Sequence, residues 1–537
     1  MDNFNRRRFL EGTAGVAAGA VFAPSVHAQS APAYKPEKGA KLRVLRWSRF
    51  VQGDIDQYMK NVAAFTAKTG VEVRVDNEGW EDVRPKAAVA ANTGAGPDII
   101  LSTNDDANLY PEKLLDVTDL CEYLGKKYGG WYPACEAYLK PDGKRWIGVA
   151  LGAAGAMLVY RQSHVKAAGF DGVPKDTAGF LKLLQAMKEK GTPAGFALGN
   201  ATGDGLWCNW LLWSHGGKLV DKDNKVVIDS PETIKALEYA KEMYATFAPG
   251  TLSWLDPNNN KAFLDGQVSL TNNGISIYYA AKNSKDEKIM AMKEDIHHAP
   301  YPIGPVGVPT ESHLFFNQMI MKYTKYPQAA KEFLRFMMEK EQFDPWLTAA
   351  GGYIAHPLDA YSKTEIWTSD PKHTAYRDCV KNMRPAGYAG KLGYASAGAG
   401  ADFIVVNMVA EAASGSKTPK EAAEGRLNLL VGGDAALLDE CRPILQCFAE
   451  NIFHAGPVGA GHSMKLLHNF VSLGTVALIA EAAACSAQHG VPPEAFVDIL
   501  AKGGGGGVAL ERLRPYLLSG DTSSLRFSLA NACKDLG

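Results

Sequence analysis

The chain has 537 residues, of which 57 are Lys or Arg and 58 are Asp or Glu, so its formal net charge is -1. This length exceeds what one hydrophobic core usually organises and predicts several domains. The balanced charge gives no general attraction to nucleic acid or to an anionic membrane. Hydrophobic residues make up 46% of the chain, which is enough to fill ordinary globular cores. We therefore expect a soluble, multidomain protein with no nucleic-acid partner.

The N-terminus has the pattern of an export signal. Asn5-Arg6-Arg7-Arg8-Phe9-Leu10 precedes an apolar stretch rich in Gly and Ala from Gly12 to Ala23, and Val26-His27-Ala28 has the small-x-small form that signal peptidase accepts. We predict a twin-arginine signal peptide over residues 1–28, cleaved near Ala28, and a periplasmic mature protein. An amphipathic surface anchor is the alternative.

The cysteines and histidines do not form a metal-binding pattern. Cys121 and Cys135 are spaced so that two neighbouring elements could be bridged in an oxidising compartment. Cys208 and Cys379 lie in apolar helical patterns and are expected in the core. The pair His297-His298 is isolated, with no Cys or carboxylate spacing to complete a site. We expect no metal and no cofactor.

After the export signal, predicted strands and helices alternate along the chain. The pattern predicts a strand at 42–47, a helix at 54–69 ended by Gly70, a strand at 71–75, a helix at about 80–92 and a strand at 98–101. Residues 145–300 repeat this pattern, with short strands at 146–149 and 157–160. Such alternation predicts an α/β fold with mainly parallel sheets. We expect two lobes around a cleft, with the chain crossing between them more than once.

Four segments of this region carry a family resemblance. In chain order they are Gly94–Ile100, Trp207–Gly217, Ala262–Leu270 and Tyr326–Phe336. Together they resemble the family 1, carbohydrate-type extracellular solute-binding proteins of ABC importers, over about residues 40–425. The resemblance implies a bilobal periplasmic-binding-protein fold that closes on a ligand by a hinge motion, and docking onto the permease subunits of an ABC transporter. It implies a small polar solute, a sugar or sugar derivative, as the ligand.

Candidate ligand contacts follow from the chemistry of sugars. A sugar presents apolar C–H faces and a ring of hydroxyls, so a cleft that binds one needs aromatic platforms and polar side chains. Residues of these types fall at predicted strand or helix ends: Trp47, Trp80, Asn104, Asp105, Trp254, Asn272, Asn273 and Tyr353. Each has a structural alternative, because any tryptophan can belong to the core, Asn272-Asn273-Gly274 can make a turn, and Asp105 can cap a helix. Trp207, Trp210 and Trp213 recur at helical spacing and fit a core helix better than a platform.

The last hundred residues resemble a different family. Residues 402–425 have the form of the helix that closes such binding proteins, yet the chain continues with Gly456-Pro-Val-Gly-Ala-Gly461, Lys465 and Asn469. This segment is similar to the C-terminal helical domain of β-hydroxyacid dehydrogenases of the 3-hydroxyisobutyrate type. The resemblance implies that Lys465 matches the catalytic lysine, Asn469 a substrate-positioning residue and Lys534 a cofactor-side or substrate-side contact. Lys465 and Asn469 stand one turn apart on a helix, where an ammonium could donate to a reacting oxygen.

The dehydrogenase pattern is incomplete. Hydride transfer needs a nicotinamide site built by a Rossmann unit, and no strand followed by G-x-G-x-x-G and a helix occurs in the chain. Gly504-x-Gly506-x-x-Ala509 follows the helical pattern at 493–502 and is expected to be a loop. We expect a solute-binding protein at 31–427, not an enzyme, fused to an all-α fragment at 428–537 that could dimerise. The alternatives are an NAD-dependent β-hydroxyacid dehydrogenase and a gene-model artefact at the junction, which a transcript spanning codons 415–440 would resolve.

Overall fold

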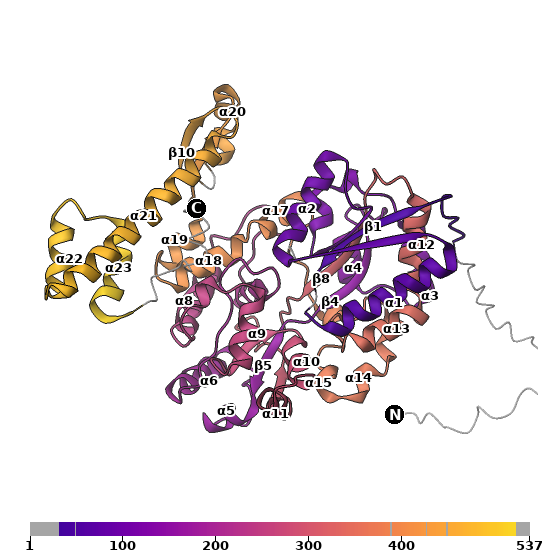
Figure 1. Ribbon diagram of the computed structural model, residues 1–537, viewed down its shortest axis with the longest axis horizontal. Coiled ribbons are helices and arrows are strands. Elements are labelled where there is room, and N and C mark those ends of the chain that lie inside the picture. The colour runs from indigo at the N-terminus through magenta and orange to yellow at the C-terminus, as the bar shows by residue number, and fades with distance from the viewer. Residues whose placement is uncertain (1–31, 49, 387–388, 426, 447–448, 522–537) are drawn as a thin grey trace, which may run out of the picture.

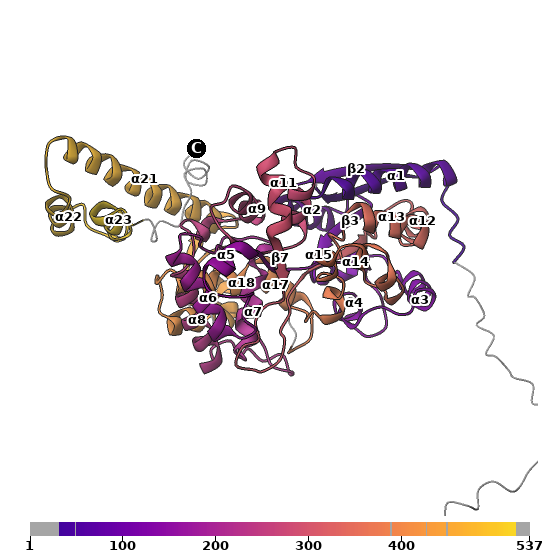
Figure 2. The ribbon, with the colours of Figure 1, turned by 90° about the horizontal axis from the view of Figure 1, so that it is seen from below.

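The computed structural model describes residues 32–521, apart from 49, 387–388, 426 and 447–448 (Figure 1). The predicted signal peptide at 1–28 and Lys534 lie outside the described residues. Within them, two α/β lobes are followed by a smaller C-terminal unit that projects away from the second lobe, as Figures 1 and 2 show.

The first lobe is built on a five-stranded sheet with the order β2-β1-β3-β8-β4. Strands β1, β2 and β3 are parallel, whereas β8 runs antiparallel to both β3 and β4. The β3 strand has all five residues buried because helices cover both of its faces. Its strands are β1 Lys41–Trp47, β2 Glu72–Glu78, β3 Ile99–Thr103, β4 Val149–Ala154 and β8 Leu314–Ile320. Its helices are α1 Gln52–Thr69, α2 Trp80–Thr93, α3 Thr118–Lys127, α4 Pro133–Leu139, α12 Pro327–Met337 and α13 Lys340–Ala349.

The second lobe contains a three-stranded antiparallel sheet with the order β6-β5-β7. Its strands are β5 Met157–Arg161, β6 Leu270–Asn273 and β7 Ile296–Ala299. Its helices are α5 Gln162–Ala167, α6 Thr177–Glu189, α7 Trp207–Ser214, α8 Pro231–Tyr244, α9 Asp256–Leu264, α10 Ser276–Lys282, α11 Glu287–Asp295, α17 Tyr394–Ala401, α18 Ile404–Ala413 and α19 Pro419–Glu424. The short helices α14 Ile366–Ser369, α15 Pro371–Thr374 and α16 Cys379–Asn382 lie between α13 and α17 in the chain.

The chain passes between the lobes three times. It leaves the first lobe between β4 and β5, returns between β7 and β8, and leaves again after α16 to reach α17. Gly155 lies in the first connection, and a Cβ there would clash with the sulfur of Cys379 and the ring of Tyr376. The connection therefore packs closely against the segment that follows α15, which brings parts of the chain more than 200 residues apart together.

Most of the predicted elements are present, with shifted ends. The β-α-β-α-β order of the first lobe is confirmed, and α1 ends at Gly70, which adopts the left-handed conformation and donates its N–H to Thr66. The strand predicted at 146–149 is wrong by three residues, since β4 begins at Val149. The single helix expected at 402–425 is two helices, α18 and α19, because Thr418 caps a new helix after the turn at Gly415.

The C-terminal unit is not all-α, as the sequence suggested, because it begins with a β-α-β unit. Strands β9 Leu427–Gly432 and β10 Ala449–Gly456 pair in parallel, with α20 Ala435–Leu445 between them. Three helices follow, α21 Ala460–Gln488, α22 Pro493–Lys502 and α23 Val508–Ser519. Gly461 of the dehydrogenase-like motif lies where α21 meets β9, and a Cβ there would clash with the Leu430 carbonyl. Close packing therefore accounts for a glycine at this position, and no catalytic role is needed to explain it.

The core residues separate into clusters that follow these units. One cluster joins the first-lobe sheet to its helices, a second fills the second lobe, and a third contains Ile479, Leu510 and Leu513 of the C-terminal unit. Trp207, Trp210 and Trp213 are at most 1% exposed, so the expectation that they belong to the core is confirmed. Cys208 and Cys379 are buried as expected. Cys121 and Cys135 are both free thiols, so the bridge that their spacing allowed does not form.

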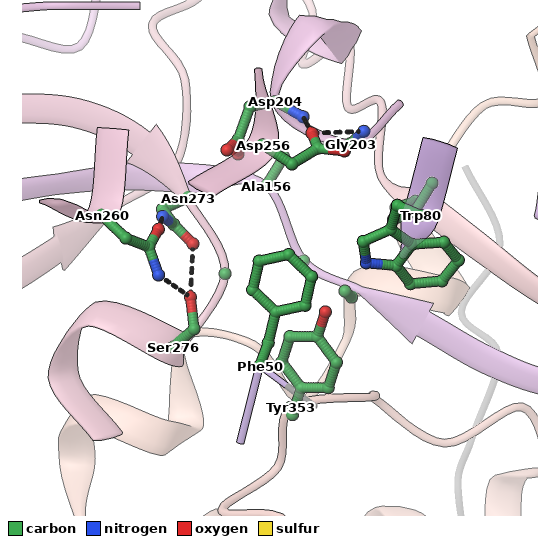
Figure 3. Close-up of a pocket in the computed structure, with 14 residues that line it drawn as sticks. Phe50, Trp80, Ala156, Gly203, Asp204, Asp256, Asn260, Asn273, Ser276 and Tyr353 are labelled. Atoms are coloured by element: carbon green, nitrogen blue, oxygen red, sulfur yellow. Dashed lines mark hydrogen bonds between the residues drawn. The ribbon is translucent and has the colours of Figure 1, made fainter. Parts of the chain in front are cut away.

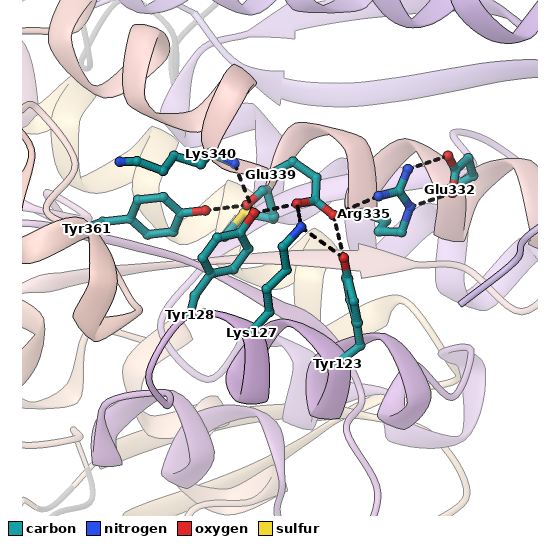
Figure 4. A network of polar contacts seen from close by, with 9 residues as sticks. Tyr123, Lys127, Tyr128, Glu332, Arg335, Glu339, Lys340 and Tyr361 are labelled. Carbon is teal, nitrogen blue, oxygen red and sulfur yellow. Dashed lines mark hydrogen bonds and ion pairs between the residues drawn. The ribbon is translucent and has the colours of Figure 1, made fainter. Parts of the chain in front are cut away.

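A buried polar network ties three helices of the first lobe together (Figure 4). The Glu339 carboxylate, 8% exposed, accepts hydrogen bonds from Tyr123 at 2.9 Å, from Arg335 at 2.7 Å and from Lys127 at 2.5 Å, and a further one from Tyr128. Burial alone would raise the pKa of Glu339, but these donors outweigh it and lower the pKa. The network fixes α3 against α12 and the start of α13.

Replacing Glu339 by Gln tests this network. Glu339→Gln leaves Arg335 and Lys127 without their shared carboxylate, so we expect the free energy of unfolding at pH 7 to fall by about 3 kcal/mol. Because the pKa of Glu339 is lowered by folding, its contribution is present at neutral pH and is lost as the pH falls through that pKa. Urea unfolding of both proteins between pH 7 and 3 should therefore show the difference shrinking.

The neighbouring Glu341 provides the matched control. It is exposed on α13, so Glu341→Gln should change the free energy of unfolding by less than about 0.5 kcal/mol. Equal effects of the two substitutions would show that Glu339 does not hold the helices together.

Candidate functional site

A cavity lies where the two lobes meet, beside the first crossing of the chain (Figure 3). It encloses about 410 Å³ and is lined from both sides. The first lobe and the crossing contribute Phe50, Trp80, Ala154, Gly155, Ala156, Leu314 and Tyr353, and the second lobe contributes Gly203, Asp204, Asp256, Asn260, Asn273, Gly274 and Ser276. An aromatic wall therefore faces a polar wall.

The aromatic wall is held by stacking. Trp80, the first residue of α2, stacks on Trp47 at the end of β1, with ring centroids 5.1 Å apart and planes 11° apart. Phe50 stacks on Tyr353 at 6.3 Å, and Phe316 of β8 lies behind both Trp80 and Tyr353. Each ring is braced by another, so flat apolar faces are presented to the cavity in one arrangement.

The polar wall is organised by Asp256 at the start of α9. Its carboxylate accepts the backbone N–H groups of Thr202 at 3.1 Å, Gly203 at 2.9 Å and Asp204 at 2.8 Å, which fixes the loop before α7 against α9. Pro257 is the second residue of α9, in the first turn, where its missing N–H costs no helical hydrogen bond.

Asp204 lies beside this carboxylate. Burial of its carboxyl raises the pKa of Asp204 well above its ordinary value, and the neighbouring Asp256 raises this pKa further. A hydrogen bond from Asn259 acts in the opposite direction but does not outweigh them. The raised pKa of Asp204 favours its protonated form, in which the carboxyl can donate a hydrogen bond.

Amide side chains complete the wall. Asn273, at the end of β6, donates to Asn260 of α9, Asn260 donates to Ser276 at 2.9 Å, and Ser276 donates back to Asn273 at 2.9 Å. This closed ring of hydrogen bonds holds three polar groups at the edge of the cavity. Together with Asp204 they offer donors and acceptors opposite the aromatic faces, which suits a ligand with hydroxyls on an apolar frame.

Of the eight residues predicted as ligand contacts, three line this cavity. Trp80, Asn273 and Tyr353 do so. Trp47 is fully buried behind Trp80 and supports it. Asn272 is also buried, and its side-chain amide donates to the Asp204 carbonyl at 3.0 Å.

The other three predicted residues lie elsewhere. Trp254 packs against Gly195 in the second lobe, outside the cavity lining. Asn104 and Asp105 line a second, neighbouring cavity. Asp105 makes no capping hydrogen bond to the short helix at Asp106–Leu109, so the capping alternative does not hold, and it accepts a hydrogen bond from Ser396 at 2.8 Å instead.

Five aromatic or polar lining residues were absent from the sequence-based set: Phe50, Asp204, Asp256, Asn260 and Ser276. The run Asp256-Pro-Asn-Asn-Asn260 between Trp254 and an apolar stretch is a usable signal, because it combines a helix start with several polar groups. Phe50 and Ser276 carry no such signal, since their place depends on how the two lobes meet.

The dehydrogenase-like residues lie far along the chain, in the C-terminal unit. Lys465 is exposed on α21, one turn before the half-buried Asn469. Lys534 is outside the described residues. His297 and His298 lie inside strand β7, and no group of three His, Cys, Asp or Glu side chains within the described ranges could hold a metal ion.

The main part of the chain matches a known protein family. Residues 60–375 match the model of the bacterial extracellular solute-binding proteins, and the chain belongs to that family. Two sugar-receptor structures share the fold. The GacH receptor of Streptomyces glaucescens, solved unliganded and with acarbose, aligns with a TM-score of 0.61 at 17% identity over 76% of this chain and 99% of that one. A solute-binding protein of Thermotoga lettingae, bound with α-D-tagatose, aligns with a TM-score of 0.62 at 17% identity over 76% and 100%.

The C-terminal unit matches a second family. Residues 459–537 match the model of the NAD-binding region of NADP-dependent 3-hydroxyisobutyrate dehydrogenase. The NAD-dependent L-serine dehydrogenase of Pseudomonas aeruginosa is 38% identical over 95 residues, 18% of this chain and 32% of that protein. The chain spans between 32% and 59% of the length of the curated dehydrogenases that it matches. The likeness is therefore to part of a dehydrogenase.

The carboxyl of Asp105 yields a pH-dependent test of the second cavity. Burial raises the pKa of Asp105 to about 6, despite the hydrogen bond from Ser396. Since the folded pKa exceeds the unfolded value, folding favours the protonated form, and Asp105 lowers stability increasingly as the pH rises from about 4 to about 6. We expect Asp105→Asn to raise the free energy of unfolding by about 2 kcal/mol at pH 7.5 and by nothing at pH 4.

Asp106 gives the opposite control. Its carboxylate pairs with Arg84 at 2.9 Å, so Asp106→Asn should lower the unfolding free energy at pH 7.5. Urea titrations at both pH values measure the two effects. A destabilising Asp105→Asn at pH 7.5 would contradict the account.

Proposed function

We propose that this protein binds a small carbohydrate or polyol between its lobes and delivers it to an ABC importer. The observation that carries the proposal is the cavity with an aromatic wall on one lobe and a ring of amide and hydroxyl groups on the other. Aromatic faces pack on the C–H face of a sugar ring while polar groups pair with its hydroxyls. The ligands of the two similar structures, acarbose and tagatose, support this class.

Delivery follows from the family and the predicted export signal. An extracellular solute-binding protein functions outside the cytoplasm, and the Arg-rich start at residues 5–10 supports export by the twin-arginine route with cleavage near Ala28. The transport partner is then the permease of an ABC transporter. Closure of the two lobes on the ligand supplies the signal that the permease reads.

The division of the chain is part of the proposal. A solute-binding unit at 31–427 is followed by a fused module at 428–537, and separate hydrophobic clusters support a boundary there. We assign no dehydrogenase activity to the module. Support comes from its partial coverage of the dehydrogenases and from its single β-α-β unit, far smaller than the domain that holds a dinucleotide.

Thermal shift with a ligand panel tests the binding function. A ligand that binds only the folded state raises the melting temperature by mass action. Among monosaccharides, disaccharides and polyols, we expect at least one compound to raise the melting temperature in a concentration-dependent way. If NAD raises it and no carbohydrate or polyol does, the dehydrogenase alternative replaces the proposal.

A pair of tryptophan variants locates the site. Trp80→Leu removes the flat face from the cavity, so the dissociation constant of the compound found above should rise at least tenfold, or about 1.4 kcal/mol. Trp254→Leu is the control, because that ring lies outside the cavity lining. Calorimetric titration measures both, and equal losses would place the ligand elsewhere.

A second role, dimerisation, is supported by the helix α21. Its C-terminal half packs on α22 and α23 through Val476 and Ile479, and its first residues pack on β9 at Gly461. After that contact, five apolar side chains are between 44% and 65% exposed: Met464, Leu466, Leu467, Phe470 and Val471. By length and composition α21 is also the one helix among the described residues that could cross a membrane. A continuous apolar face of this kind favours association, and we infer that it pairs with the same face of a second copy.

Substitutions on α21 test that pairing in the full chain. Leu467→Lys combined with Phe470→Lys places two charges in the exposed apolar face, so we expect the protein to change from dimer to monomer in light scattering coupled to gel filtration. Gln488→Lys adds a charge at the far end of the same helix and should leave the dimer intact. A monomeric wild-type protein, or a dimer that survives the double substitution, would rule out this interface.

A further inference from the structure

A second cavity lies next to the proposed sugar site and differs from it in chemistry. This distal compartment has about 660 Å³ of empty space, part of which is open to solvent, and is lined by both lobes and by the segment that crosses between them last. Most of its lining is aliphatic or small, and the aliphatic side chains are those of Leu206, Leu219, Ile404, Val405 and Val406. Among the described residues that line it, Phe403 is the one with an aromatic ring.

A small hollow lies between the two cavities and is lined in part by Trp80, Arg84 and Thr202. Trp80 also lines the proposed sugar site, while Arg84 and Thr202 also line the distal compartment. These shared lining residues place the distal compartment beside the proposed sugar site, on its Trp80 side.

Several polar side chains of the distal compartment have partners within the protein. Arg84 forms an ion pair with Asp106 at 2.9 Å, and Asp105 accepts the Ser396 hydroxyl at 2.8 Å. Asn104 accepts the backbone N–H of Phe315 at 3.3 Å, and Asn209 donates to Ser312 at 3.5 Å. These pairings leave the aliphatic side chains as the main surface available to an occupant. Such a surface gains free energy by removing apolar area from water.

The geometry points to a ligand that is a glycoside, with its sugar ring in the cavity at Trp80 and an apolar alkyl or aryl group in the distal compartment. The assignment rests on the proposed function, because the sugar ring must first occupy the cleft. Val406 of α18 forms part of the far wall and reaches the loop before α7, since a Cβ on Gly205 would lie 3.1 Å from its methyl group. Helices α17 and α18 therefore select the apolar group, while the facing walls of the cleft select the sugar.

Matched glycosides test the assignment by calorimetric titration. The probes are methyl and phenyl glycosides of glucose, galactose, mannose and xylose, in both anomers. For at least one sugar, the phenyl glycoside should bind about ten to a hundred times more tightly than the methyl glycoside, because the ring is removed from water in the distal compartment.

Three variants locate the effect. Val406→Phe fills the compartment and should abolish the advantage of phenyl over methyl while leaving methyl glycoside binding within about twofold. Ala399→Leu fills it from α17 and serves the same purpose if Val406→Phe unfolds. Asn407→Phe adds the same ring to the exposed neighbouring position of α18 and should preserve the advantage.

The outcomes separate the two proposals. If methyl and phenyl glycosides bind equally, or if the advantage of phenyl survives both filling substitutions, the assignment of the distal compartment is wrong. Sugar binding in the cleft would be unaffected by either result. Failure of every sugar and glycoside to bind would overturn the proposed function and this inference with it.

Discussion

The stacked pair of Trp47 and Trp80 is the contact on which the first-lobe side of the cleft depends. Trp47 is fixed from behind, because its indole N–H donates to the buried Asp54 carboxylate at 3.2 Å, and Asp54 also accepts Trp346 at 2.8 Å. Arg46 neutralises this carboxylate and lies over the Trp47 ring at 4.5 Å. A buried charge is thus compensated by an ion pair and two indole donors. Its structural result is one fixed orientation for Trp80, which lines both the cavity and the small hollow beside the distal compartment.

The second-lobe side is built on a different principle. Asp256 gathers three backbone N–H groups, and Asn273, Asn260 and Ser276 close a ring of hydrogen bonds. Each polar group is positioned by another, so the wall is preorganised before a ligand arrives. A rigid apolar face on one lobe and a rigid polar face on the other suit closure on a ring that has both kinds of surface.

Local patterns in the sequence predicted the lobes and only part of the site. Alternating strands and helices indicated the first-lobe sheet, and Trp80, Asn273 and Tyr353 were found because they follow predicted elements. Phe50 and Ser276 were missed because three crossings bring distant segments together, and periodicity carries no information on that assembly. The same reason explains why Trp254, predicted as a ligand contact, lies outside the cavity lining. Its residue type fits a sugar platform, but in the fold it packs against Gly195. At the C-terminus, the β-α-β unit escaped notice because one pair of strands gives a weak pattern.

The chain joins a complete solute-binding fold to part of another family, and the chemistry favours the cleft as the functional centre. Lys465 stands on an exposed helix, whereas the cleft has a shaped cavity with complementary walls. A crystal structure with a bound carbohydrate from the ligand panel tests this most directly. The account predicts electron density for the sugar between Trp80 and the Asn260–Asn273 wall, with the lobes closed around it. Density for the carbohydrate against α21 near Lys465, with an empty cleft, would contradict it.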